Sequence, residues 1–388
     1  MVALRSTDAE DPAELRAALV RAMDGGPALG FGMVGDAPDW VPSGTAVVIA
    51  TSGSSGIPKR VALSGEALRA SADATAARIG SGRWLLALPA GYVAGLQVVV
   101  RSLIAGTDPV ALSGRFSPTT FAESTLSMLR PSSAASGVPD LYTSLVPAQL
   151  ATLLDAADDS PVRAALRAYR AILVGGQALP EPLRDRAADL GVSLVRTYGS
   201  TETSGGCVYD GVPLDTVAVR VVEGELRIAG PMLAEGYLGD GELTAKNFSR
   251  DEHGIRWYHT GDLGLLDEGV VRVHGRADNV IVSGGINVSL DRVERAVRRV
   301  PGLAGAVVVG VEDERWGEAS VVVAPRGAAL RRSEAEQLAH ARDVVAEELG
   351  KHARPSRLIM VDELETLASG KPDREAIRRA VAELHRPS

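Results

Sequence analysis

The stretch Thr51-Ser52-Gly53-Ser54-Ser55-Gly56-Ile57-Pro58-Lys59 decides the fold class of this chain. It follows an apolar run, residues 46–50, that predicts a buried strand, and a helical pattern begins near Ser64. We therefore expect a loop at the carboxyl end of a strand, where open α/β sheets bind ligands. Its glycines allow close approach of the backbone, its hydroxyl and N–H groups suit an anion, and Lys59 adds a compact positive charge. The loop suits the phosphates of a nucleotide, although it lacks the Walker A spacing. The alternative is a Ser/Gly-rich surface linker.

Length and composition bound the class of protein. At 388 residues the chain is too long for one typical hydrophobic core, so we expect two domains. Apolar residues make up 45% of it, and the net charge of −8 gives no reason to expect nucleic acid or an anionic membrane as a partner. No apolar run approaches the roughly 18 residues of a membrane span, and the first residues do not resemble a signal peptide. These features predict a cytoplasmic protein, and the sequence leaves open whether it forms a homodimer.

The cysteine and histidine residues do not predict a reactive or metal-binding site. The one cysteine, Cys207, cannot form an internal disulfide, and nothing near it in sequence resembles an activating base. The six histidines are scattered without the spacing of metal ligands. We interpret these side chains as structural or surface residues.

The first half of the chain alternates predicted strands with predicted helices. Helices are expected at residues 11–24, 64–79, 91–105, 118–129, 142–156 and 180–190, and strands at 46–50, 84–88, 108–112, 132–138, 171–174 and 192–197. This alternation predicts a parallel, wound sheet and an α/β fold.

After Tyr198 the pattern changes twice. Short alternating segments at 217–222, 225–228, 257–259, 264–266 and 270–274 predict a small antiparallel, barrel-like subdomain. Further on, helices at 291–300, 333–349 and 373–385 mix with strands at 306–310, 320–324 and 356–361. We therefore expect a large domain at residues 1–276 and a small, mobile α+β domain at residues 277–388.

Four more stretches carry recognisable chemistry, in this order: Tyr198-Gly199-Ser200-Thr201-Glu202, Tyr258-His259-Thr260-Gly261-Asp262-Leu263, Gly275-Arg276-Ala277-Asp278-Asn279 and Ser369-Gly370-Lys371-Pro372-Asp373-Arg374. Together with the first loop they resemble the signatures of the adenylate-forming superfamily, which includes acyl-CoA synthetases, carrier-protein adenylation domains and luciferases. The resemblance spans residues 51–374. Members usually carry a longer stretch before the phosphate loop, so we expect a reduced first subdomain here.

The resemblance implies an ATP site with Mg²⁺. The phosphate loop, meaning Thr51, Ser52, Gly53, Ser54, Ser55, Gly56 and Lys59, would hold the phosphates. Tyr198 and Gly199 would pack by the adenine, Thr201 would approach the α-phosphate, and Glu202 would hold Mg²⁺, which prefers carboxylate and phosphate oxygens.

Two further residues would complete the nucleotide site by the same resemblance. Asp262 would accept hydrogen bonds from the ribose hydroxyls, as carboxylates commonly do, and Arg276 would approach the ribose or the α-phosphate.

The same resemblance implies a mechanism in two halves. A carboxylate attacks ATP to give an acyl-adenylate, with Lys371 neutralising the charge that builds up, and the thiol of CoA then displaces AMP. Between the halves the small domain would rotate about Asp278, which exchanges Lys371 for a thiol channel lined by Gly284 and Gly285. Members often have a second Asp where this chain has Asn279, so the charge balance at the hinge differs.

The residues expected to hold the acid point to a narrower family. The stretch Leu88 to Gln97, together with the short length and the Arg-rich composition, resembles the compact actinobacterial o-succinylbenzoate–CoA ligases of menaquinone biosynthesis. Six residues are expected to line the acyl pocket: Tyr92, Gly95, Leu96, Ser144, Gly175 and Gly176. Because this substrate has two carboxylates, the second needs donors, for which Ser144, Gln149 and Arg196 are the candidates.

Two other functions stay open at this point. The first is a stand-alone enzyme that loads an aryl or amino acid onto the phosphopantetheine of a carrier protein. The absence of an acidic residue between Leu88 and Gln97 disfavours an amino acid. The second is a non-catalytic nucleotide-binding relative, which is disfavoured because Lys371, Glu202 and Asp262 are all present.

Overall fold

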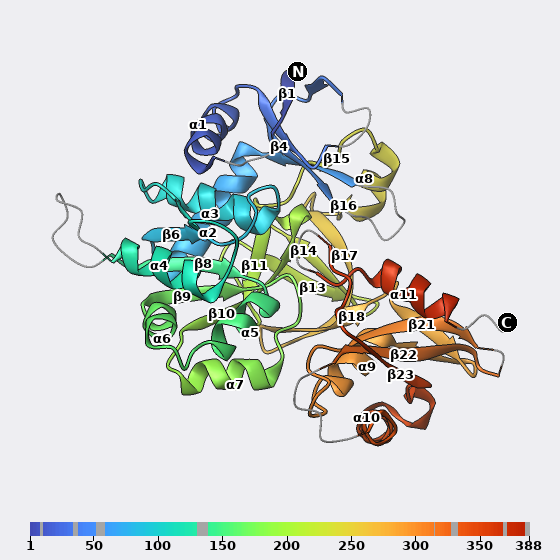
Figure 1. Cartoon of the computed structure of the whole chain (residues 1–388). Coiled ribbons are helices and arrows are strands. Elements are labelled where there is room, and N and C mark those ends of the chain that lie inside the picture. The colour runs from blue at the N-terminus through green and yellow to red at the C-terminus, as the bar shows by residue number, and fades with distance from the viewer. Residues whose placement is uncertain are drawn as a thin grey trace.

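A computed structural model of the whole chain describes residues 1–7, 11–33, 38–51, 59–129, 139–313, 315–326, 333–367 and 371–384. Its strands form four sheets with helices between and around them, so the expected mixed α/β architecture is confirmed (Figure 1). Among the described residues no helix combines the length and the apolar character needed to cross a bilayer.

The first sheet has six strands, in the order β15-β5-β4-β2-β1-β3. Its members are β1 (Val2–Ser6), β2 (Ala28–Phe31), β3 (Trp40–Val41), β4 (Thr45–Thr51), β5 (Lys59–Ser64) and β15 (Gly236–Tyr237), with α1 (Pro12–Met23) and α8 (Gly241–Asn247) beside it.

Two expectations about this sheet are wrong. The first strand of the chain is β1 rather than the run at 46–50, because short strands precede that run. The phosphate stretch also joins two antiparallel strands, β4 and β5, instead of a strand and a helix. The helix that follows does begin at Ser64, whose Oγ accepts a hydrogen bond from the Ala67 N–H.

The second sheet has seven strands, in the order β12-β11-β10-β9-β8-β6-β7. They are β6 (Arg83–Leu86), β7 (Val110–Ala111), β8 (Leu141–Leu145), β9 (Tyr169–Val174), β10 (Leu194–Ser200), β11 (Gly205–Tyr209) and β12 (Val212–Pro213). The pairs from β7 through β10 are parallel, as expected for a wound sheet, and the last two strands run antiparallel.

The helices associated with this sheet are α2 (Gly65–Ile79), α3 (Val93–Ile104), α4 (Pro118–Met128), α5 (Pro147–Asp155), α6 (Ser160–Arg167) and α7 (Glu181–Asp189). The helix expected at 142–156 is wrong at its start, because residues 141–145 form the fully buried strand β8 and Pro147 opens α5. The strand expected at 132–138 lies outside the described residues.

Helices α2 and α3 lie between the first two sheets. Their buried residues share one hydrophobic cluster with strands of both, including Ile49, Leu68, Leu96 and Leu173. A helix covered on both sides can be apolar around most of its circumference, which explains the almost uninterrupted apolar run of α3.

The third sheet is the expected antiparallel subdomain. It contains β13 (Ala218–Val222), β14 (Glu225–Ala229), β16 (Phe248–Arg250), β17 (Arg256–Asp267) and β18 (Val270–Arg276). The segments expected at 257–259 and 264–266 belong to the single long strand β17, which pairs with β14, β16 and β18.

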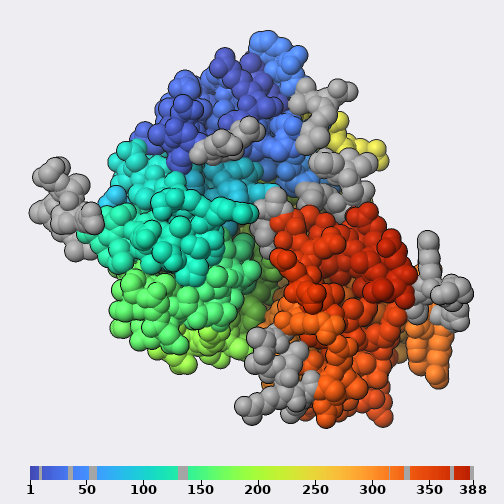
Figure 2. Space-filling model, in the orientation of Figure 1, coloured from blue at the N-terminus to red at the C-terminus, as the bar shows by residue number. Residues whose placement is uncertain are grey.

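The fourth sheet and its helices form the C-terminal unit, residues 280–384. Its strands are β19 (Val280–Ser283), β20 (Ile286–Ser289), β21 (Val307–Asp313), β22 (Gly317–Pro325) and β23 (Arg357–Val361), and its helices are α9 (Leu290–Val297), α10 (Glu334–Leu349) and α11 (Arg374–Glu383). In Figure 2 this unit, in orange and red, forms a lobe against the rest of the molecule. In the described part of the chain, its two hydrophobic clusters contain no residue from before Ile281.

Candidate active site

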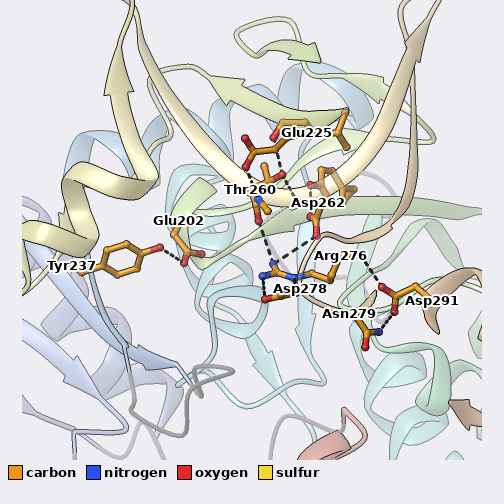
Figure 3. A network of polar contacts seen from close by, with 12 residues as sticks. Glu202, Glu225, Tyr237, Thr260, Asp262, Arg276, Asp278, Asn279 and Asp291 are labelled. Carbon is orange, nitrogen blue, oxygen red and sulfur yellow. Dashed lines mark hydrogen bonds and ion pairs between the residues drawn. The ribbon is translucent and has the colours of Figure 1, made fainter. Parts of the chain in front are cut away.

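Several of the sequence-predicted residues meet where the ends of β10 and β18 lie beside the middle of β17 (Figure 3). Two short turns bring in further side chains. The first is the 3₁₀ turn Thr201–Thr203, which directly follows β10 and contains Glu202. The second is the segment after Arg276, where β18 ends and the chain enters the C-terminal unit.

Tyr198 and Asp262 form a half-buried pair at the centre of this region. The Tyr198 hydroxyl donates to Asp262 Oδ2 at 2.5 Å. Burial raises the pKa of Asp262, while the Tyr198 hydrogen bond and the Arg276 charge act in the opposite direction. Burial and the neighbouring carboxylate both raise the pKa of Tyr198, which keeps the phenol protonated as a donor.

A β-bulge places this pair. The register of β10 against β11 shifts between Tyr198 and Gly199, and a Cβ on Gly199 would collide with the backbone carbonyl of Gly205. Glycine is therefore required at position 199 by the close approach of two strands.

Arg276 is held by three carbonyl or carboxylate groups. Its guanidinium binds both carboxylate oxygens of Asp278, at 2.9 and 2.8 Å, and also donates to the Thr260 carbonyl oxygen at 3.2 Å. Its Nη1 lies 3.6 Å from Asp262 Oδ1. The Asp278 hydrogen bonds raise the pKa of Arg276, and Arg276 in turn lowers the pKa of Asp278. Arg276 thus links the candidate ribose-binding carboxylate to the candidate hinge.

Glu202 faces Tyr237, which belongs to β15 of the first sheet. The Tyr237 hydroxyl donates to Glu202 Oε1 at 2.9 Å, and burial together with the Glu202 charge raises the pKa of Tyr237. Lys59 Nζ lies 5.7 Å from the centre of the Tyr237 ring. The end of the phosphate stretch therefore lies near the candidate metal ligand.

Five residues of the expected phosphate loop fall outside the part of the chain that the structure describes. They are Ser52, Gly53, Ser54, Ser55 and Gly56, between Thr51 at the end of β4 and Lys59 at the start of β5.

Magnesium would fit this site through Glu202. Tyr237 occupies one Glu202 oxygen, so the other can serve as a ligand beside phosphate oxygens, which matches the usual Mg²⁺ environment of one or two carboxylates plus substrate phosphates. Among the described residues no cluster of three or more His, Cys, Asp or Glu forms a cage of protein ligands.

Lys371 reaches this region from the C-terminal unit. A Cβ on Gly176, which follows β9, would lie 3.5 Å from Lys371 Cε. Removal of water from the ammonium lowers the pKa of Lys371, and the negative charge of Glu202 partly opposes this. The backbone beside Lys371 is ordered by the bridge between Thr366 and Pro372 and by the hydrogen bond from the Leu367 N–H to the Lys371 carbonyl.

The residues that were expected to line the acyl pocket have different structural roles. Gly175 and Gly176 follow β9 beside Lys371, and a Cβ on Gly175 would collide with Thr197. Tyr92 precedes α3 as its N-cap residue. Gly95 is required because a Cβ there would collide with the Pro89 carbonyl, and Leu96 is completely buried in the core.

The donors expected for a second carboxylate are already engaged or buried in the sheet. Gln149 donates to the Ala87 carbonyl and accepts from the Val146 N–H. Arg196 forms a half-exposed ion pair with Asp210. Ser144 is buried within β8.

Two buried polar side chains on α3 were not predicted as site residues from the sequence. Gln97 and Arg101, one helical turn apart, are buried, and neither Gln97 Oε1 nor Arg101 Nε has a hydrogen-bond partner. Arg101 Nη2 contacts the Tyr209 hydroxyl at 3.4 Å, and the guanidinium lies 5.1 Å from the Trp84 ring centre. No carboxylate within the described ranges forms an ion pair with Arg101. Burial lowers its pKa. The available signal was the interruption of an apolar run by these two polar residues.

Gly284 and Gly285 form the turn between β19 and β20, with φ values of 59° and 80°. Trp316 packs on this turn and is 49% exposed, so the expected channel residues lie on an open surface of the C-terminal unit. Cys207 is buried, which raises the pKa of its thiol to about 12 and agrees with its exclusion as a nucleophile.

Two family models match the chain. The model described as AMP-binding enzyme matches residues 4–238, and that described as AMP-binding enzyme C-terminal domain matches residues 292–371.

Individual relatives agree with these models. The chain is 42% identical over 344 residues to a probable 2-succinylbenzoate–CoA ligase of Mycobacterium tuberculosis, which covers 87% of this chain and 85% of the relative. Two solved structures of the o-succinylbenzoate coenzyme A synthetase of Bacillus subtilis are also similar. The complex with ATP and magnesium has a TM-score of 0.71 at 25% identity and covers 94% of this chain and 81% of the other. The complex with the acyl-adenylate intermediate has a TM-score of 0.73 at 24% identity, with coverages of 97% and 83%.

The Tyr198–Asp262 pair makes a testable prediction. In Tyr198→Phe the carboxylate loses its hydroxyl donor, so the pKa of Asp262, already raised by burial, should rise further. Titration of the carboxyl carbon in protein labelled at aspartate would measure this. Tyr142→Phe, which removes a hydroxyl bonded to the distant Ile79 carbonyl, is the matched control. An unchanged or lower pKa in Tyr198→Phe would contradict the assigned hydrogen bond.

Proposed function

Because this chain belongs to the AMP-binding enzyme family, we propose that it is an AMP-forming acid–CoA ligase whose substrate is o-succinylbenzoate, as in menaquinone biosynthesis. The observation that carries the activation chemistry is the Lys371 ammonium, which lies against Gly176 in the field of Glu202. The relative with 42% identity supports the choice of acid and of CoA.

The first half-reaction joins two negatively charged groups. An oxygen of the substrate carboxylate attacks the α-phosphorus of ATP, the bond to the β-phosphate oxygen breaks, and pyrophosphate leaves. Lys371 would stabilise the charge that builds up between carboxylate and phosphate, because its ammonium group carries the opposite charge.

Protein groups would hold the nucleotide while this occurs. Asp262 would accept from the ribose hydroxyls, with Tyr198 fixing its orientation, and Arg276 would place positive charge near the ribose or α-phosphate. Thr201, Thr51 and Lys59 would contact the phosphates. Glu202 would hold Mg²⁺, which supplies charge neutralisation on the phosphates.

In the second half-reaction the thiol sulfur of CoA attacks the acyl carbonyl, the bond to the AMP oxygen breaks, and the thiol proton is lost to solvent. We propose that residues 277–388 rotate about Asp278 relative to residues 1–276, which withdraws Lys371 and brings Gly284 and Gly285 toward the site. The separate hydrophobic clusters of the two parts support this division.

We further propose that Arg101 compensates the second carboxylate of the substrate. Gln97 lies against Gly205, two residues after the Thr201–Thr203 turn, and Arg101 follows Gln97 one helical turn later on α3. The Arg101 guanidinium contacts the Tyr209 hydroxyl and the Trp84 ring but has no carboxylate partner in the described part of the chain, and a buried cation without a counter-charge is favoured by a bound anion. A dianionic acid would supply that anion.

The proposed activity is tested by thioester formation with ATP, Mg²⁺ and CoA. We expect a strong preference for o-succinylbenzoate over benzoate, 4-chlorobenzoate, acetate and a medium-chain fatty acid. Preference for another acid would contradict the substrate assignment. Release of AMP without a CoA thioester would instead favour loading of a carrier protein.

Lys371→Ala should separate the two half-reactions. Adenylate formation should fall about a hundred- to a thousandfold, as when one preorganised charge-stabilising donor is removed. Thioester formation from supplied acyl-adenylate should continue, because Lys371 would have left the site by then. Pyrophosphate release and thioester formation measure the halves separately, and an equal loss in both would refute this role for Lys371.

Arg101→Gln should affect the dianionic substrate selectively. The kcat/KM for o-succinylbenzoate should fall about thirtyfold or more, as when one partner of a buried charge pair is truncated, while that for benzoate should change little. Thermal unfolding should show no loss of stability, because the substitution removes a buried, uncompensated charge. An equal effect on both acids would contradict the proposed contact.

A further inference from the structure

Helix α9 of the C-terminal unit binds the backbone of β18 through two side chains of opposite charge. Asp291 Oδ2 accepts a hydrogen bond from the Arg276 N–H at 2.7 Å. Four residues later, Arg295 Nη2 donates to the carbonyl oxygens of Val273 and His274, at 3.0 and 3.3 Å. Residues four apart lie on the same face of a helix, so Asp291 and Arg295 act on the same strand together.

The strand is shaped to receive this face. A Cβ on Gly275, where φ is 144°, would lie 2.7 Å from the Cβ of Asp291. The absence of a side chain at position 275 therefore allows α9 to approach β18 closely enough for the Asp291 contact.

Asn279 holds the Asp291 carboxylate in place. Its side-chain amide donates to Asp291 Oδ1 at 2.7 Å, so each Asp291 oxygen accepts one hydrogen bond (Figure 3). An aspartate at position 279 would place a second carboxylate against Asp291, and the two would repel each other. The asparagine at this position is therefore matched to Asp291.

The contacts of Asp291 and Arg295 with β18 lie across the proposed hinge, whereas the hydrogen bond between Asn279 and Asp291 lies on its C-terminal side. Val273, His274 and Arg276 precede Asp278, whereas Asp291 and Arg295 follow it. The contacts of α9 with β18 must break if the C-terminal unit rotates about Asp278, and they exist in the orientation that places Lys371 beside Gly176.

A second set of contacts connects α9 to the lysine segment. Arg374, three residues after Lys371, binds both oxygens of the buried Glu294, at 2.9 and 2.7 Å. Glu294 also accepts from the Val308 N–H, at 2.9 Å, and pairs with Arg298 at 2.8 Å. The position of α9 therefore determines the position of the residues that follow Lys371.

We propose that Asp291 and Arg295, with Asn279, form a latch that holds the C-terminal unit in the adenylate-forming orientation. These are positioning residues, because they act on the reaction through the placement of Lys371. The proposal rests on the two half-reactions of the proposed function. It adds that this orientation is stabilised by the contacts of Asp291 and Arg295 with β18, and that Asn279 positions Asp291 for its contact.

The pairing of Asn279 with Asp291 can be broken and restored by substitution. In Asn279→Asp, adenylate formation should fall about tenfold or more, because the latch loses hydrogen bonds to a charged group and gains a repulsion. Thioester formation from supplied acyl-adenylate should be unchanged or faster. In the double variant Asn279→Asp with Asp291→Asn, the amide now at position 291 can donate to the carboxylate now at position 279. The oxygen of that amide still accepts from the Arg276 N–H, so adenylate formation should recover.

The matched control is Arg299→Gln, two residues after the end of the same helix, where Arg299 pairs with Glu348 inside the C-terminal unit. This variant should leave both half-reactions unchanged. Equal loss of both half-reactions in Asn279→Asp, or no recovery in the double variant, would overturn the latch.

A distance measurement tests the latch without any acyl substrate. Spin labels at Asp189→Cys on α7 and Glu347→Cys on α10 occupy exposed positions on the two sides of the hinge, and the natural Cys207 is buried. The distance distribution should broaden or shift in Asn279→Asp and return in the double variant. An identical distribution in all three proteins would overturn the latch, whereas failure of the substrate assignment alone would leave this measurement unaffected.

Discussion

The placement of one ammonium group, that of Lys371, depends on how the C-terminal unit is held against β18. Lys371 lies against Gly176 and in the field of Glu202, and both of those residues belong to the part of the chain before the hinge. The connection across residues 276–291 consists largely of side chains bonded to backbone groups, such as Asp291 to the Arg276 N–H. Hydrogen bonds of this kind are individually modest and can be exchanged, unlike the burial of a hydrophobic interface. A catalytic charge can therefore be positioned well and still be withdrawn.

The same junction is where the charges of the proposed nucleotide site are balanced. Arg276 binds Asp278 through two hydrogen bonds and lies near Asp262, so one guanidinium serves a carboxylate on each side. Arg276 and the Tyr198 hydroxyl both favour the charged form of the half-buried Asp262, against the effect of burial. Because Arg276 also provides the N–H bound by Asp291, the nucleotide site and the hinge share a residue.

The sequence alone predicted the parts of this structure in which local signals agree with the fold. The parallel strands β6, β9 and β10, the apolar helix α3 and the Ser64 cap follow from apolar periodicity and capping. Strand β8 was missed because Thr143 and Ser144 made a buried strand look polar, and β5 because only pairing with β4 favours it over the start of a helix. Motif residues such as Tyr198, Asp262 and Arg276 were predicted together, whereas Arg196 and Gln149 were taken as free donors although each has a local partner.

Arg101 and Asn279 are unusual residues in the sequence, and only their neighbours in the structure explain them. Arg101 interrupts an apolar run, and the structure shows that it is buried beside the Tyr209 hydroxyl and the Trp84 ring, without a carboxylate partner among the described residues. Asn279 replaces an expected acidic residue, and Asp291 explains why, since a carboxylate at both positions would repel. Each residue is unusual at its position in the sequence, and its surroundings, which sequence spacing cannot reveal, show what it does or lacks in the structure. Such residues are therefore where the acid preference and the conformational balance of this enzyme are most open to change by a single substitution.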